Sequence, residues 1–149
     1  MNKKRDLPVK VRIVKEFKAS PQKVFDAWLD PEMISKWMFG PDVREEEILK
    51  LKNDPKEGGS FSYVVKRGKE EIDHMGTYFE IDRPNRLVFS WGAGTDPAGE
   101  SVVTIEIEPT GQGCRLTLVH ELAEKWAEYA DRTKEGWSYM MGKLKEILA

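Results

Sequence analysis

Hydrophobic and polar residues alternate along much of the first 120 positions, which is the pattern of half-buried β-strands. The alternation begins at Val9, Val11 and Ile13, with Lys10 and Arg12 between them. From about position 42 onward, turn residues interrupt it roughly every ten residues. We predict strands at 9–18, 43–51, 61–66, 72–81, 87–91, 103–108 and 114–120. Because short turns join most of them, neighbouring strands are expected to pair antiparallel.

Two helix-start signals lie between the first two of these strands. Ser20-Pro21 and Asp30-Pro31 each place a capping side chain before a proline at the first helical position. The first signal predicts a short helix over 21–29. The second predicts a helix that ends before Gly40-Pro41.

After Glu121 the apolar period changes from two to that of an amphipathic helix. Some 27 residues would make a helix roughly 40 Å long, enough to lie across a whole sheet. On its polar side we expect the i,i+4 ion pairs Glu121/Lys125 and Glu128/Arg132.

A sheet with one apolar face needs a cover, and this helix is the natural one. The sequence therefore predicts an α+β fold. In it a strongly curved antiparallel sheet of six to seven strands wraps around a long C-terminal helix, with two short helices between the first two strands. Residues 9–149 form a single domain, and residues 1–8 form a flexible tail. A curved sheet and a lone helix leave a cleft of the kind in which ligands bind.

Composition narrows the function classes. The chain has 149 residues, and 24 Lys and Arg against 26 Asp and Glu give a net charge of −2. That balance argues against a nucleic-acid partner, which needs a basic excess. The chain shows neither a membrane span of ~20 apolar residues nor a signal peptide, so we expect a cytoplasmic protein without stable membrane insertion. Cys114 is the only cysteine, which excludes an internal disulfide and a cysteine metal cluster.

A set of short motifs resembles a known family. They are Ala19-Ser20-Pro21, Val24-Phe25, Ala27-Trp28, Asp30-Pro31-Glu32, Trp37, Gly58-Gly59-Ser60-Phe61, the run from Gly76 to Ile81, Pro84, Arg86-Leu87-Val88-Phe89, Trp91, the run from Cys114 to His120, Gly136-Trp137 and Leu144. In this order and spacing the chain resembles the activator of heat-shock protein 90 ATPase homologue-like family. That family belongs to the START-like (SRPBCC) superfamily, whose fold is the helix-grip fold.

The resemblance implies several functions. The superfamily includes carriers of lipids, hormones, polyketides and flavonoid-like molecules, some cyclases and hydroxylase components, and a co-chaperone. Fold alone does not choose among them.

The sequence does not match the known catalytic motifs that parts of it resemble. His120-Glu121 begins like a zinc-protease helix, but Glu124 stands where the second histidine is needed. A Gly-x-Ser-x-Gly nucleophile elbow is missing, and Gly92-Ala93-Gly94 lacks the third glycine of a dinucleotide loop. We therefore predict no catalytic residue, no metal ligand and no cofactor. Strand parity places His74 toward solvent. It places His120 toward the interior, where it is a satisfied structural residue or, alternatively, contacts a ligand, handles a proton or binds a metal.

The aromatic residues offer the best binding surface, although core packing is the alternative for each of them. Polar groups on Tyr63, Thr77, Ser90 or His120 would orient a flat, mostly apolar ligand. The helical glycine Gly136 either lets the helix approach the sheet or leaves room for the ligand. The predicted ligand-binding residues are Trp37, Phe39, Phe61, Tyr63, Met75, Thr77, Phe79, Phe89, Trp91, His120, Tyr129, Thr133, Gly136, Trp137 and Met140.

Three functions follow as hypotheses. The first is binding of a small hydrophobic or aromatic molecule, for sensing (for example under stress), sequestration or transport. The second is a co-chaperone that activates a heat-shock ATPase through an exposed surface patch. The third is a cofactor-free cyclase, hydrolase or isomerase with His120 or Tyr63 as acid or base. Binding is favoured over catalysis, and we expect a monomer or homodimer.

Overall fold

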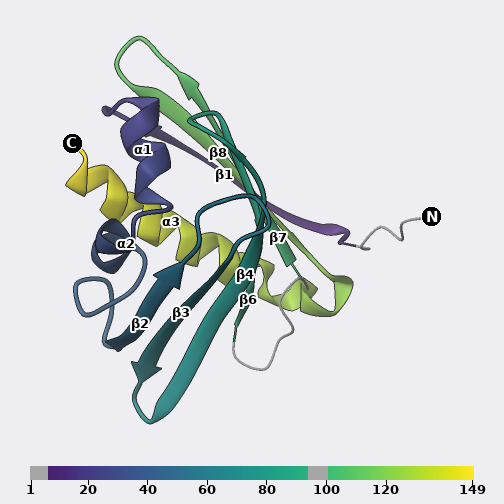
Figure 1. Cartoon of the computed structure of the whole chain (residues 1–149). Helices are drawn as coiled ribbons and strands as arrows, with labels where there is room; N and C mark the ends of the chain where they lie inside the picture. The colour runs from purple at the N-terminus through teal and green to yellow at the C-terminus, as the bar shows by residue number, and fades with distance from the viewer. Residues whose placement is uncertain (1–6, 94–100) are drawn as a thin grey trace.

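The computed structural model describes residues 7–93 and 101–149, which build one antiparallel sheet with a long helix across its inner face (Figure 1). The elements in chain order are β1 (Val9–Phe17), α1 (Pro21–Ala27), α2 (Pro31–Trp37), β2 (Glu47–Asn53), β3 (Ser60–Arg67), β4 (Glu70–Asp82), β5 (Arg86–Ser90), β6 (Gly92–Ala93), β7 (Ser101–Pro109), β8 (Cys114–Leu122), the 3₁₀ helix η1 (Glu124–Tyr129) and α3 (Ala130–Ile147). This confirms the predicted α+β fold, in which a curved sheet holds a C-terminal helix. The tail predicted for residues 1–8 falls mostly outside the described residues.

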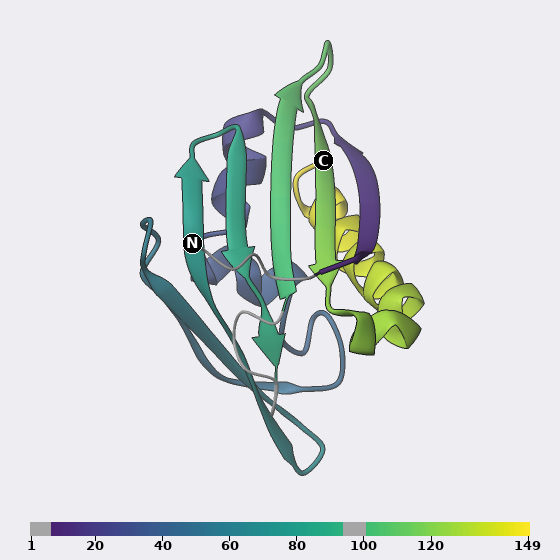
Figure 2. The same ribbon diagram turned by 90° about the vertical axis from the view of Figure 1, so that its right-hand side faces the viewer.

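The strand order is β1-β8-β7-β5-β4-β3-β2, and the short strand β6 pairs with β4 beside this path. All seven predicted strands are present. The eighth strand, β6, could not be predicted from the alternation because it has only two residues. Figure 2 shows the outer face of the sheet, with α3 lying behind it.

The first and last strands are neighbours. Val9 lies opposite Leu122 and Phe17 opposite Cys114, so β1 pairs with β8 along its whole length. In both strands the inward positions are more buried than the outward ones, and along β8 they are all buried. This pairing brings the start of the domain next to the strand that leads into the C-terminal helices.

The two short helices begin where their capping residues predict. The Ser20 hydroxyl accepts a hydrogen bond from the Lys23 N–H at 3.2 Å, and Asp30 accepts one from the Glu32 N–H at 3.0 Å. Each helix has a proline in its first turn. In Figure 1 both helices lie near the C-terminal half of α3, where they close one end of the core.

Tryptophan packing joins these helices to the sheet and to α3. The rings of Trp28 and Trp37 meet edge to face with centroids 4.7 Å apart, and the Trp37 indole N–H donates to the Ala27 carbonyl at 3.0 Å. Trp28 also packs against Trp137 of α3, with centroids 5.6 Å apart. The core is therefore continuous from α1 and α2 to the long helix.

The strand predicted at 43–51 begins only at Glu47, because the residues before it are held in a turn. The Glu46 carboxylate is fully buried and accepts a hydrogen bond from the Gly40 N–H at 2.8 Å. It also pairs with Arg44 at 3.0 Å and with Arg67 at 2.8 Å. A buried charge needs such partners, and here they fix the segment between α2 and β2.

The C-terminal helix is shorter than predicted. Strand β8 extends to Leu122, Ala123 is extended, and a 3₁₀ helix over Glu124–Tyr129 precedes α3. The change of helix type also breaks the i,i+4 geometry between Glu128 and Arg132, and the expected ion pair between them does not form. The 3₁₀ turn has a second effect, because it places two aromatic side chains at the opening described next.

Candidate functional site

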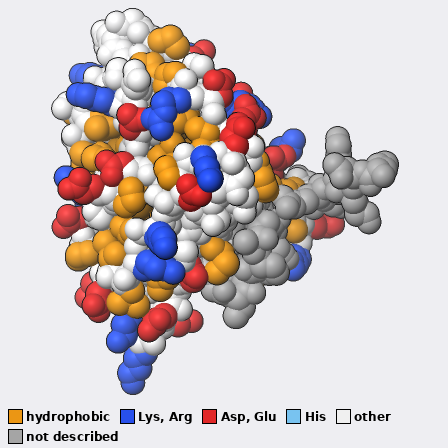
Figure 3. Space-filling model, in the orientation of Figure 1, with side chains coloured by type: hydrophobic (Ala, Val, Ile, Leu, Met, Phe, Trp, Pro, Cys, Tyr) orange, Lys and Arg blue, Asp and Glu red, His pale blue; other side chains and the backbone are white. Residues whose placement is uncertain are grey.

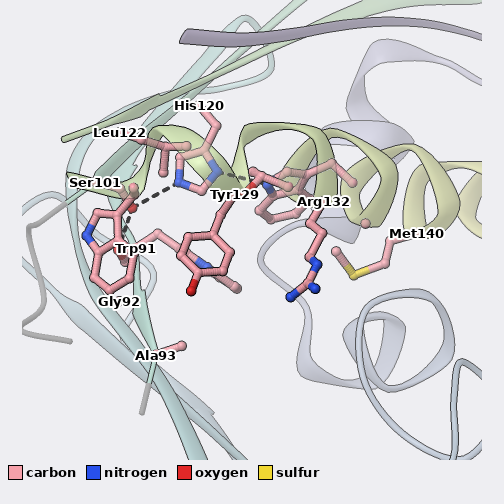
Figure 4. Close-up of a pocket in the computed structure, with 13 residues that line it drawn as sticks. Trp91, Gly92, Ala93, Ser101, His120, Leu122, Tyr129, Arg132 and Met140 are labelled. Atoms are coloured by element: carbon pink, nitrogen blue, oxygen red, sulfur yellow. Dashed lines mark hydrogen bonds between the residues drawn. The ribbon is translucent and has the colours of Figure 1, made fainter. Parts of the chain in front are cut away.

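A pocket of about 340 Å³ lies between α3, η1 and the strands β6, β7 and β8 (Figure 4). This volume is at the lower end of the range for small-molecule sites. The residues that line it are Trp91, Gly92, Ala93, Ser101, His120, Leu122, Trp126, Tyr129, Arg132, Thr133, Gly136, Trp137 and Met140.

The helical side of the pocket follows from the period of α3. Position 129 is the N-cap of α3, and positions 132, 133, 136, 137 and 140 follow it by three, four, seven, eight and eleven residues, so their side chains lie on one face of the helix. Gly136 sits in the middle of this row, and a Cβ atom placed there would meet nothing within 4 Å. The absence of a side chain at Gly136 therefore leaves open space rather than permitting close packing.

The sheet side of the pocket carries a chain of three hydrogen bonds. The Trp137 indole N–H donates to Nδ1 of His120 at 3.0 Å. The other imidazole nitrogen, Nε2, lies 2.9 Å from the Ser101 hydroxyl, which itself donates to the Trp91 carbonyl at 2.6 Å. Since Nδ1 accepts and the serine proton is already used, Nε2 must carry the imidazole proton.

Because these hydrogen bonds use its polar groups, the inner wall has little acid–base reactivity. His120, Ser101 and Trp137 are all buried. Burial lowers the pKa of His120 to about 4, because desolvation disfavours the charged imidazolium. At neutral pH the imidazole is uncharged and both of its nitrogens are engaged, so the inner wall presents mainly ring and methylene surface.

The outer rim of the pocket is different in character. Tyr129 and Arg132 are exposed, and Thr133 is partly exposed. The guanidinium carbon of Arg132 lies 5.8 Å from the centroid of the Tyr129 ring. In Figure 4 the Arg132 side chain extends away from His120, and the Tyr129 hydroxyl points to the same side. The polar groups at the mouth are therefore available to a ligand, whereas those of the inner wall are bonded to one another.

The fifteen residues predicted to bind a ligand fall into three groups. Seven of them line this pocket: Trp91, His120, Tyr129, Thr133, Gly136, Trp137 and Met140. Five are buried in the core outside the pocket: Trp37, Phe39, Phe61, Tyr63 and Phe89. Three lie on the opposite face of the sheet: Met75, Thr77 and Phe79.

The inward orientation predicted for Met75, Thr77 and Phe79 is wrong. Along β4 the buried positions are His74, Gly76 and Tyr78, and Phe79 is 44% exposed. His74, predicted to face solvent, is 7% exposed and points inward.

The reversal on β4 has two physical causes. A β-bulge between Tyr78 and Glu80 shifts the strand by one residue, so the apolar residues on its two sides do not share a face. Gly76 occupies an inward position where a Cβ atom would lie 2.0 Å from the Ser90 carbonyl oxygen. Parity counted from the apolar residues alone therefore selects the outer face.

Buried His74 is held by one bond and by aromatic neighbours. Its Nδ1 donates to the Tyr63 carbonyl at 3.1 Å, and its ring centroid is 4.5 Å from that of Phe39. The pKa of His74 is lowered to about 4, chiefly by burial and further by the charges of Arg67 and Arg44. His74 is thus a second neutral imidazole.

The hydroxyls of Tyr63 and Ser90, also expected to orient a ligand, are bonded within the protein, and Thr77 lies on the outer face of the sheet. The Tyr63 hydroxyl lies 3.2 Å from that of Tyr78, which also accepts from the Asn53 amide at 3.1 Å. Burial raises the pKa of both tyrosines. The Ser90 hydroxyl accepts from the Thr77 N–H at 2.9 Å. None of these contacts faces the pocket.

Six lining residues were not among the predicted ligand-binding residues: Gly92, Ala93, Ser101, Leu122, Trp126 and Arg132. Ser101 could have been found from parity, because it alternates with the inward positions Val103 and Ile105. Arg132 lies one residue before Thr133 on the helix face that was predicted, but the expected pair with Glu128 assigned it to the outside.

The described part of the chain contains no candidate metal-binding site. Over residues 7–93 and 101–149, no group of three or more His, Cys, Asp or Glu side chains could hold a metal ion. Cys114 is buried at the start of β8, and burial raises the pKa of its thiol. Nor is any helix among these residues long and apolar enough to cross a membrane.

Comparison with known proteins gives a family and a fold. The model of the family described as "Activator of Hsp90 ATPase homolog 1-like protein" matches residues 18–149. None of the curated proteins matches the sequence.

Solved structures share the whole architecture. A protein from Chromobacterium violaceum is 22% identical with a TM-score of 0.79, over 95% of this chain and 98% of that one. A protein from Nitrosomonas europaea is 20% identical with a TM-score of 0.80, over 96% of each chain. CalU16 from Micromonospora echinospora is 24% identical with a TM-score of 0.70, over 94% of this chain and 76% of that one. At these identities the likeness establishes the helix-grip fold.

Proposed function

The chain belongs to the Activator of Hsp90 ATPase homolog 1-like family, and from this premise we propose that it binds a small hydrophobic or aromatic molecule in the pocket between the sheet and α3. Sensing, sequestration or transport of that molecule would be its use. Lipid-, polyketide- and flavonoid-like compounds are the classes of ligand that suit such a lining.

The observation that carries the proposal is the open space over Gly136. A glycine inside a helix costs about 1 kcal/mol relative to alanine, and a Cβ atom at this position would meet no neighbour. Around the gap stand Trp91, Trp126 and Trp137, whose rings offer broad apolar surface. Burying a ligand against them would stabilise the complex by about 25 cal/mol per Å² of apolar area.

The inner wall supports binding rather than acid–base chemistry. A catalytic His120 would have to release its bond to either Trp137 or Ser101 before it could move a proton. Its lowered pKa of about 4 also makes it a weak base at neutral pH. Catalysis in the pocket is therefore the less supported alternative.

A thermal-shift panel of fatty acids, sterols, flavonoids and aromatic polyketides tests the proposal. A ligand at 100 times its Kd should stabilise the protein by about 2.7 kcal/mol, and tryptophan fluorescence gives a second readout. The informative variant is Gly136→Leu, which places a side chain in the open space. Gly142→Leu is its matched control, since Gly142 is also in α3 with nothing near its Cβ but does not line the pocket.

Both leucine variants should fold, because leucine is the better helix former. We expect saturable shifts in the wild type and in Gly142→Leu, and none in Gly136→Leu. No shift with any class of compound in the wild type, or equal shifts in both variants, would overturn the proposal.

The family's description supports a second candidate, activation of an Hsp90-type ATPase. Such an activity would use the outer surface, where acidic, basic and hydrophobic side chains are interspersed on the face shown in Figure 3. Stimulation of purified Hsp90 ATPase that persists in Gly136→Leu would favour this candidate. Stimulation that is lost in that variant would instead tie it to the pocket.

A further inference from the structure

The pocket has an apolar inner wall and a polar mouth, which restricts how a ligand can be oriented. The polar groups of the buried wall, on Trp137, His120 and Ser101, are used in one chain of hydrogen bonds. A ligand's polar group placed there would have to break one of these bonds and leave a buried partner unsatisfied. The apolar part of the ligand therefore belongs against this wall.

Arg132 is the cationic group at the mouth. Among the residues that the structure describes, no carboxylate lies within 4.0 Å of its guanidinium nitrogens and it makes no hydrogen bond. Within this part of the chain, its charged end contacts the Tyr129 ring. By contrast, Arg44, Arg67, Arg83, Arg86 and Arg115 all pair with carboxylates.

The helix geometry explains why Arg132 does not pair with Glu128. Glu128, four residues earlier, lies in the 3₁₀ helix, and Arg132 lies in the first turn of α3. The side chain lies at the mouth of the pocket, where the Tyr129 ring packs beside it (Figure 4). An aromatic ring beside a guanidinium favours the charge and restricts its planar fork of donors.

We propose, on the basis of the binding function above, that the ligand of this pocket carries an acidic group, which Arg132 binds at the mouth while the apolar body lies against the His120 wall. A guanidinium binds a carboxylate or sulfonate through two parallel N–H···O bonds. Tyr129 and Thr133 also line the pocket, and their hydroxyls offer further donors. The ligand class is thus an aromatic or aliphatic acid rather than a neutral sterol or hydrocarbon.

Two fluorescent probes with the same aromatic body separate charge from shape. 8-Anilinonaphthalene-1-sulfonate carries an acidic group, and N-phenyl-1-naphthylamine lacks it. Titration of each into the wild type should give a Kd at least about tenfold lower for the sulfonate, as expected for a charged hydrogen bond. Gly136→Leu identifies the signal that comes from the pocket.

Substitution of the arginine is the decisive step. Arg132→Gln should raise the Kd of the sulfonate about tenfold or more and leave that of the neutral probe within about twofold. Arg132→Lys should recover part of the loss, because it restores charge without the planar fork. The matched control is Arg12→Gln, which makes the same change in net charge at an exposed position of β1 that alternates with buried Val11 and Ile13.

The outcomes distinguish the two proposals. If the neutral probe binds in a Gly136-dependent way but the sulfonate binds no tighter, the binding function stands and the acidic ligand is excluded. The acidic ligand is also excluded if Arg12→Gln weakens the sulfonate as much as Arg132→Gln does. If neither probe binds in a Gly136-dependent way, both proposals fail.

Discussion

The indole N–H of Trp137 donates to Nδ1 of His120 at 3.0 Å, and this one bond fixes the proton of the imidazole on Nε2. It joins the long helix to strand β8 across the inner end of the pocket. The two rings also meet at 71°, with centroids 6.1 Å apart. The orientation of the wall therefore depends on a polar contact inside an otherwise apolar layer.

Removing this indole donor should destabilise the protein. In Trp137→Phe, Nδ1 of His120 is left buried without a partner, which costs about 1–3 kcal/mol in addition to the loss of ring volume. Urea unfolding of Trp137→Phe, His120→Leu and the double variant separates the two effects. We expect the cost of Trp137→Phe to be smaller by about 1–3 kcal/mol in the His120→Leu background. Additive costs would show that the bond contributes nothing.

Stability should fall as the pH is lowered from 6.5 toward 4. His74 and His120 have pKa values of about 4 in the folded protein, against about 6.5 when unfolded. In this interval the unfolded chain binds more protons than the folded one, so protons favour unfolding. Each histidine removes up to about 1.4 kcal/mol per pH unit, or roughly 3 kcal/mol over the whole interval.

Urea unfolding at pH 7, 6, 5 and 4.5 measures this dependence. His120→Gln retains a side-chain amide and should flatten the slope by the contribution of one histidine, while a slope unchanged by the substitution would contradict the assignment. Imidazole NMR shifts give an independent reading. An imidazole of the folded protein that titrates near pH 6.5 would refute the prediction for that histidine.

Gly76 should tolerate no side chain, although it lies inside a strand. A Cβ atom there would be 2.0 Å from the Ser90 carbonyl oxygen and 2.6 Å from Cζ of Phe61, so backbone as well as a ring would have to move. Gly76→Ala should therefore destabilise the protein by about 3 kcal/mol. Gly111→Ala is the control, because nothing lies within 4 Å of that position, and it should change stability by less than about 0.5 kcal/mol. Similar unfolding midpoints for both variants would contradict the close approach.

Most of the fold could be predicted from short-range signals. Alternation located seven of the eight strands, and Ser20 and Asp30 marked the helix starts because their side chains bond the first free N–H groups. The start of α3 could not be predicted in this way. It depends on pairing between Val9 and Leu122, which draws the end of β8 into the sheet although the local period is helical.

The site was only partly predictable, for a different reason. The helix face from Tyr129 to Met140 follows directly from its period, and it lines the pocket. The orientation of β4 depends on a bulge after Tyr78 and on contact between Gly76 and the Ser90 backbone. Neither feature can be recognised from the hydrophobic pattern, because that pattern shows where apolar residues lie and does not show backbone shifts. Arg132 was missed because its expected ion pair assumed one continuous helix.

The pairing of β1 with β8 has a consequence for the time course of folding. The contacts between Val9 and Leu122 and between Phe17 and Cys114 join residues about a hundred positions apart. During synthesis β1 has no strand partner until the last strand has left the ribosome, whereas β3 and β4 form a hairpin with each other at once. Such a high contact order is typical of slow folding, and until β8 arrives β1 and β7 expose unpaired edges to other chains. The protein must therefore pass through a period of vulnerability to aggregation that ends only with its C-terminal third.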